Sequence, residues 1–288
     1  MRNNPWACLW VTLCLPEIIL TMSQNIPGIY NYCDRWCERC CFTDRCAVYE
    51  EEKNDTAEEK DIQNKAFWDK LAQNFQKSIE LLHELARERG IDLNKIPPEE
   101  DERIELQSKK TQRLIKSDPL IALCREYAMG ARRIMEDEEL WRKKGEEMIQ
   151  HQKMGVVDIT ELEDQLHLMK ECKAVICWYL FFIEVKFSRA LSGIIEDWEE
   201  NDSIQTDYNG SAKIGLLAVN RSREAWTQLY TLITDEDTVL PILASLSKID
   251  NAAREKFPNA AKFLRPGFDD NIDKAKYITH TPTKPIKY

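Results

Sequence analysis

Helical periodicity is the feature that most constrains the fold of this chain. Between residues 158 and 194, apolar side chains recur at spacings of four and three, with Lys173 as the only break, the pattern of one face of a long α-helix. Within it, residues 174–183 are apolar on every side, but this run is too short to cross a bilayer. We therefore expect a central helix that other helices surround. The positions that carry the pattern are Leu162, Leu166, Met169, Ile176, Leu180, Ile183, Phe187, Leu191 and Ile194.

Shorter segments of the chain show the same periodicity. Helices are expected over about 57–89 and 119–154, from about 211, and over about 236–256, while the two prolines within 94–101 make that segment a connector. Local chemistry supplies their start and stop signals. These signals are a capping box at Thr56 and Glu59, Asp118 before Pro119, Asp158 three residues before Glu161, and Gly90 as a terminator.

The fold class follows from these helices and from the lack of turn residues. Nine glycines and eleven prolines in 288 residues are too few for a many-stranded β protein. The expectation is an all-α antiparallel bundle of four to five helices over 56–270, with a tail over 271–288. A cysteine-rich metal-binding motif and an acidic linker occupy 22–55. Residues 1–21 are interpreted as an over-extended gene start before Met22, or else as a targeting segment.

Five of the ten cysteines lie within fifteen residues, between Tyr32 and Cys46. Thiolates bind soft or borderline metals, and several converging negative sulfurs are tolerated only beside a cation. The cluster therefore predicts a metal centre whose ligands are Cys33, Cys37, Cys40 and Cys46, with Cys41 as a substitute ligand.

The compact spacing of these cysteines favours a [4Fe-4S] cluster. Structural zinc sites usually use two cysteine pairs separated by about a dozen residues or more, whereas one short loop can wrap a cubane cluster. Zinc remains the alternative, followed by disulfides or free thiols. Three arginines of the segment, Arg35, Arg39 and Arg45, can offset an anionic cluster, and Trp36 and Phe42 can shield it from water.

Three families share parts of this motif. Cys33-x3-Cys37-x2-Cys40 resembles the cluster motif of radical S-adenosylmethionine enzymes, but Arg39 replaces their usual aromatic residue and no β/α barrel follows. The stretch from Cys37 to Cys46 is similar to the end of the motif in iron-sulfur nucleases, but Cys41 stands where they have proline and their catalytic strand is absent. As a whole, residues 32–49 resemble bacterial helical proteins with an N-terminal cysteine cluster, a resemblance that implies no specific activity.

A second candidate site lies in the expected bundle. Glu80 and His83 are spaced like ligand pairs of di-iron bundles, and Glu184 follows the all-apolar stretch, so a metal-dependent oxidoreductase with a site inside the bundle is a further alternative. A buried carboxylate must be paired or protonated. Its expected partners are Arg221, Lys186 and Arg189.

The net charge of the chain and the absence of known catalytic motifs narrow the possible classes of function. The net charge of −10 gives no support to nucleic-acid binding, and no segment is long enough to span a membrane. No phosphate-binding glycine loop or serine nucleophile elbow is present. The sequence thus predicts a cytoplasmic accessory protein that binds an iron-sulfur cluster for electron transfer or redox sensing with a protein partner. A zinc-pinned protein-interaction module is the alternative.

Overall fold

The computed structural model describes residues 25–93, 98–196, 204–233 and 235–269. Within these ranges all regular secondary structure is helical. The expectations for residues 1–21 and for the tail over 271–288 lie outside the described residues. No helix of the described ranges is long and apolar enough to cross a membrane.

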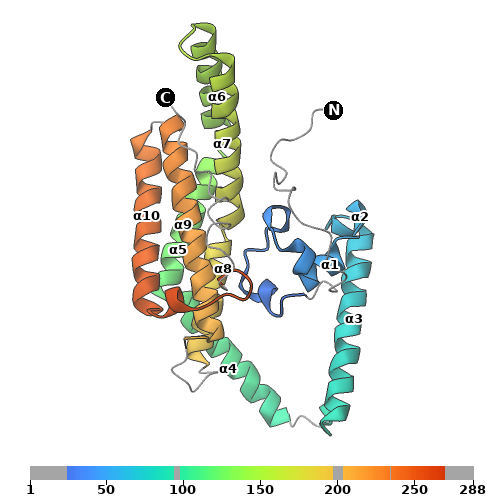
Figure 1. The fold of residues 1–288 in the computed structure, drawn as a ribbon. Helices are drawn as coiled ribbons and strands as arrows, with labels where there is room; N and C mark the ends of the chain where they lie inside the picture. Colours follow the sequence, from blue (N-terminus) through green and yellow to red (C-terminus); the bar gives the residue numbers. More distant parts are fainter. Residues whose placement is uncertain (1–24, 94–97, 197–203, 234, 270–288) are drawn as a thin grey trace, which may run out of the picture.

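Five helices share one hydrophobic core: α5, α7, α8, α9 and α10. Helix α9 packs against α7, α8 and α10, while α5 closes the other side against α8 and α10. Figure 1 shows α6 and α7 extending upward beyond this group, and α4 leading away from its lower end. The bounds are α4 (Pro98–Ser117), α5 (Pro119–Met135), α6 (Glu138–Lys153), α7 (Ile159–Tyr179), α8 (Phe182–Ile195), α9 (Asp207–Ile233) and α10 (Glu236–Lys256).

The predicted central helix is in fact two helices, α7 and α8, which are separated at Leu180 and Phe181. The prediction was wrong here because neither position carries glycine or proline, and a stretch that is apolar on every side keeps its pattern through a bend. The most extensively packed helix is instead α9, on which the expectation placed only one apolar face.

Local start and stop signals are confirmed. Thr56 and Glu59 form the reciprocal capping box of α2 (Ala57–Lys60). The Asp118 carboxylate accepts from the amide of Leu120 at the start of α5, and Asp158 does the same for α7. Gly90 ends α3 (Lys65–Glu88) in the left-handed region, with φ of 69°. The helix expected over 236–256 has those bounds.

Other boundaries are corrected. The helix expected over 57–89 divides into α2 and α3, and the one expected over 119–154 divides into α5 and α6 because the Asp137 side chain caps a new start. Helix α4 was missed: Pro98 occupies its first position, where proline is tolerated, and its polar sequence gives a weak apolar pattern. Helix α9 begins at Asp207, earlier than the expected residue 211.

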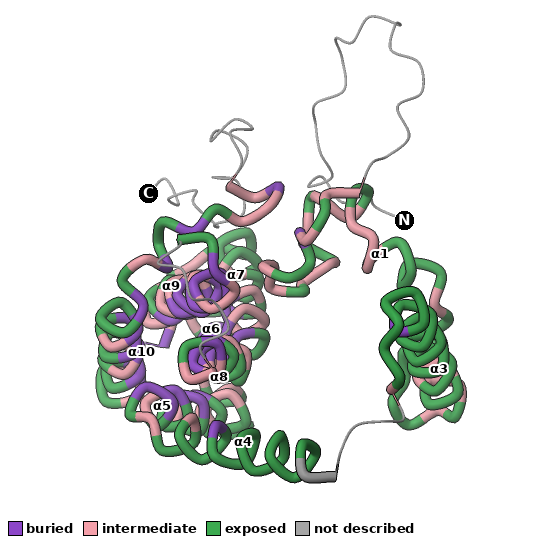
Figure 2. Tube along the Cα trace, turned by 90° about the horizontal axis from the view of Figure 1, so that it is seen from below, coloured by how far each residue is buried: buried purple, intermediate pink, exposed green. Residues whose placement is uncertain are grey.

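The apolar face expected to bring α3 into the core is exposed. Figures 1 and 2 both show α3 lying apart from the bundle helices, with its surface almost entirely accessible. Only Ala86 is buried along its length. Periodicity identified an amphipathic helix correctly but could not identify what that helix packs against.

Candidate metal centre

The cysteine-rich segment forms a closed loop between the bundle and the region of α1 (Ala47–Glu52), α2 and α3 (Figure 1). The amide of Ile26 donates a hydrogen bond to the Arg45 carbonyl oxygen at 2.9 Å, which joins the two ends. Between them the backbone makes three short 3-10 turns, and α1 follows directly: η1 (Ile29–Tyr32), η2 (Cys37–Arg39), η3 (Thr43–Arg45) and α1 (Ala47–Glu52). We call residues 26–46 the cysteine loop.

The four predicted ligands line one small cavity inside the cysteine loop. Its volume is about 20 Å³, and its lining includes Cys33, Cys37, Cys40 and Cys46. Cys41 does not border it and is exposed. The aromatic side chains predicted to shield the site, Trp36 and Phe42, line the same cavity together with Ile29, Tyr30, Tyr49 and Phe268.

The thiols of this loop interact electrostatically with one another. Burial raises the pKa of Cys37, and the neighbouring thiols of Cys33 and Cys46 raise it further. Burial also raises the pKa of Cys40 to about 11, although the amide of Phe42, which donates to its Sγ at 3.4 Å, acts in the opposite direction. Metal ligation would have to displace these protons, since the thiolate is the form that binds metals.

The backbone is strained between the first two candidate ligands. Arg35 has φ of 59°, and it is the one non-glycine residue of the described ranges with a positive φ. This conformation costs on the order of 1 kcal/mol or more for a residue with a Cβ and is concentrated at functional sites. Here it brings the Arg35 amide to the Cys33 sulfur, where hydrogen bonding favours the thiolate and lowers its pKa against the larger, opposing effect of burial.

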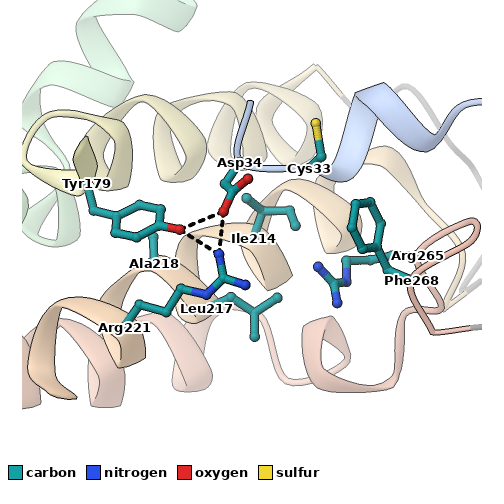
Figure 3. Close-up of a pocket in the computed structure, with 9 residues that line it drawn as sticks. All are labelled: Cys33, Asp34, Tyr179, Ile214, Leu217, Ala218, Arg221, Arg265 and Phe268. Carbon is teal, nitrogen blue, oxygen red and sulfur yellow. Dashed lines mark hydrogen bonds and ion pairs between the residues drawn. The ribbon is translucent and has the colours of Figure 1, made fainter. Parts of the chain in front are cut away.

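Asp34 fastens the cysteine loop to the bundle (Figure 3). Its carboxylate accepts a hydrogen bond from the Tyr179 hydroxyl at 2.6 Å and forms an ion pair with Arg221 of α9. Arg221 also donates to the Tyr179 oxygen at 2.5 Å, so the three groups form a closed triangle. The Asp34 carbonyl oxygen accepts from the Trp178 indole at 3.0 Å. A residue between two candidate ligands is thus held by two bundle helices.

A second set of contacts joins the cysteine loop to α7. The Trp36 ring stacks on Trp178 with 4.8 Å between centroids, and the Arg39 guanidinium lies 3.9 Å from the centroid of Trp36. Arg39 also pairs with Glu171 at 2.8 Å. Two of the arginines expected to offset a cluster are therefore already paired with carboxylates of the chain. Arg39 pairs with Glu171 of α7, and Arg35 pairs with Glu52 of α1.

The C-terminal part of the described chain covers the loop from the other side. Phe268 packs edge-on against Phe42 with 5.0 Å between centroids, and Tyr32 packs against Phe263. A Cβ at Gly210 would overlap the Tyr32 ring, so only glycine lets that ring approach α9. Phe268 also borders a second cavity of about 30 Å³, which Figure 3 shows beside Cys33, Asp34 and Arg221.

The alternative site inside the bundle is not assembled. Glu80 and His83 lie on exposed turns of α3, and Glu80 bonds Gln76 of the same helix. Glu184 lies on α8, where it pairs with Arg125 at 2.8 Å. The predicted partners of Glu184 were wrong: Arg221 binds Asp34 instead, and Arg189 binds Asp207.

Sequence reasoning also missed Asp34, Tyr179 and Arg221 as parts of the site. They are separated by 145 and 187 residues along the chain, and no local pattern relates them. The one available signal was the position of Asp34, an acidic side chain directly between two spaced cysteines.

Replacing Asp34 with alanine is expected to loosen the cysteine loop without unfolding the bundle. The loss is about 1–2 kcal/mol, at the modest end for a charged hydrogen-bond network, because the side chains of Arg221 and Asp34 are 44% and 24% exposed. This loss is measured as faster amide hydrogen exchange of residues 26–46 in Asp34→Ala than in the parent protein. Glu38→Gln, an exposed acidic position in the same loop, should leave exchange unchanged. Equal exchange in Asp34→Ala and the parent would show that the triangle does not hold the loop.

The type and location of the four candidate ligands fit a thiolate metal centre, but their side chains are not arranged in ligating geometry. Across the described ranges, no group of three or more His, Cys, Asp or Glu side chains is arranged to hold a metal ion. The described cysteines are also free of disulfides. Comparison with known proteins gives no further guidance, because no family model, no curated protein and no solved structure matches this chain.

Proposed function

We propose that the cysteine loop binds a [4Fe-4S] cluster through Cys33, Cys37, Cys40 and Cys46. The observation that carries the proposal is that these four cysteines line one cavity, whereas the adjacent Cys41 is exposed and does not line it. The four cysteines that line this cavity are the same four that the spacing of the sequence selects as ligands. A bound cluster would supply a one-electron redox centre.

The surroundings of the cavity support this assignment. Amides of Arg35 and Phe42 hydrogen-bond to Cys33 and Cys40, and hydrogen bonds to sulfur are among the groups that tune cluster potentials. Aromatic rings of Trp36, Phe42 and Phe268 line the cavity and limit water access. Residues of the cysteine loop would therefore bind and orient the cluster and would limit its contact with solvent.

The role proposed for such a protein is accessory: electron transfer or redox sensing in association with a protein partner. The cysteine loop is anchored to the bundle by Asp34 and Trp36, so a change at the thiols is coupled mechanically to α7 and α9. A cytosolic setting belongs to the proposal, because thiols there remain reduced and available to metal.

Zinc pinning of the same loop is the second candidate, and the same four thiols favour it. A tetrahedral zinc would draw the sulfurs closer together than a cubane does, and it would give the loop a purely structural role. The two candidates differ in colour and in redox activity.

The test is metal analysis of the full chain purified anaerobically. The expected result is a brown protein with a broad absorption band near ~400 nm and about four irons with matching sulfide. A colourless protein with about one zinc would replace the cluster with the structural site. Strictly reduced protein that takes up neither metal, even after reconstitution with iron and sulfide, would refute both.

A further inference from the structure

Helix α3 presents an apolar face that no described part of the chain covers. Every residue from 72 to 85 is exposed, four turns without a neighbouring element, and α3 lies apart from the bundle in both views (Figure 1, Figure 2). Five large side chains follow one face at spacings of three, four and seven: Trp68, Phe75, Ile79, Leu82 and Leu85. Phe75 is 62% exposed and Leu82 54%. A monomeric protein rarely leaves such a contiguous stripe in water.

Isolation also leaves α3 without its usual source of stability. Helices in proteins are held mainly by packing of their amphipathic face, because an isolated helix in water is marginal even with good helix formers. The contacts that α3 makes within the described chain are concentrated near its N-terminal end, where it packs against α2 and where Lys70 pairs with Asp55. The middle of the helix therefore has no packing partner among the described residues.

The charges of α3 indicate what kind of surface would complement this face. Residues 65–77 carry three lysines and one aspartate, and residues 78–88 carry three glutamates and one arginine, so the halves have net charges of +2 and −2. This order opposes the helix dipole, which favours acidic residues in the first turn and basic ones in the last. The arrangement is thus unfavourable for α3 alone, and it is complementary to the same helix running in the opposite direction.

We propose that α3 pairs with α3 of a second copy of this chain in an antiparallel, two-fold symmetric interface. The apolar stripe is centred on the boundary between the basic half and the acidic half of α3. Antiparallel pairing therefore overlaps the whole stripe and places Trp68 of one copy near Leu85 of the other. Each basic half then faces an acidic half, and the opposed dipoles lie side by side. A closed two-fold contact of this kind uses one patch twice and does not propagate into a filament. This proposal does not depend on the metal centre.

Sedimentation velocity of the full chain over a concentration series tests the interface. The parent protein is expected to dimerise, and Phe75→Glu or Leu82→Glu should each raise the dissociation constant by more than about tenfold, the effect of losing one buried apolar contact. The matched control is Val185→Glu, an equally exposed apolar position on α8 that should leave the dissociation constant unchanged. A parent that stays monomeric throughout, or a Phe75→Glu variant that dimerises like the parent, would overturn the proposal.

Charge reversal distinguishes a second copy from any other occupant. Lys65→Glu with Lys77→Glu makes the whole helix acidic, and Glu84→Lys with Glu88→Lys makes it basic, so each doubly substituted protein should be monomeric while their mixture forms a heterodimer. Lys65→Glu and Glu88→Lys favour the helix dipole at the two ends, although Lys65→Glu also removes an ion pair with Asp69. Circular dichroism of each variant therefore checks that the helix content equals that of the parent. Self-association of either variant alone at parental strength, or a monomeric mixture, would exclude the antiparallel arrangement.

Discussion

Cys37→Ser is expected to abolish metal binding by the reconstituted protein. Serine keeps the size of cysteine but replaces a soft thiolate with a hydroxyl that stays protonated at neutral pH. Changes in groups that merely support a ligand already cost about 10–100-fold in metal affinity, so removal of a ligand should exceed that. The same result is expected at positions 33, 40 and 46, whose side chains border the same cavity. Iron, sulfide and zinc counts on each variant are the measurement.

Cys41→Ser is the matched control for this series. It removes a thiol from the same loop, adjacent to Cys40, but from an exposed position outside the cavity, so metal content should equal that of the parent. Full metal content in Cys40→Ser, with loss only in the Cys40→Ser/Cys41→Ser protein, would show that the two neighbours exchange as ligands. Metal that survives removal of all four cavity thiols would contradict the site itself.

Truncation of Trp226 to alanine is expected to remove about 3–5 kcal/mol from the free energy of unfolding. Trp226 is fully buried on α9, where its indole faces Tyr127 of α5, with 3.4 Å from Nε1 to the hydroxyl oxygen. Deleting the ring leaves a cavity at the centre of the five-helix core and removes the indole donor to the Tyr127 hydroxyl. Domains of this kind are stable by only about 5–15 kcal/mol, so the loss is a large fraction of the total.

Denaturant unfolding followed by far-ultraviolet circular dichroism measures this loss as a lower midpoint with an unchanged slope. Trp226→Phe is the control, because it keeps most of the ring and should lose less stability. A Trp226→Ala protein within about 0.5 kcal/mol of the parent would be the behaviour of a surface position, and it would contradict the packing of α9 against α5.

Helix type and helix starts were predictable because their causes are local. Thr56, Asp118 and Asp158 cap helices with their own side chains, and those interactions span two or three residues. The break at Leu180 was not predictable, since a stretch that is apolar on every side loses the contrast that marks one helix from the next. The same limitation misplaced the centre of the bundle, which proved to be α9.

The sequence by itself determined the helical fold class, the helix caps and the set of candidate ligands. Each of these depends on a few neighbouring residues: on the spacing of apolar side chains, on side chains that cap the nearest amides, and on closely spaced thiols that bind soft metals. Only the tertiary structure decided that Cys41 stands outside the cavity, that Asp34 meets Tyr179 and Arg221, and that α3 keeps its apolar face exposed. These outcomes depend on how the helices pack and on contacts between residues more than a hundred positions apart. Such contacts are set by packing, and no local pattern in the chain encodes them.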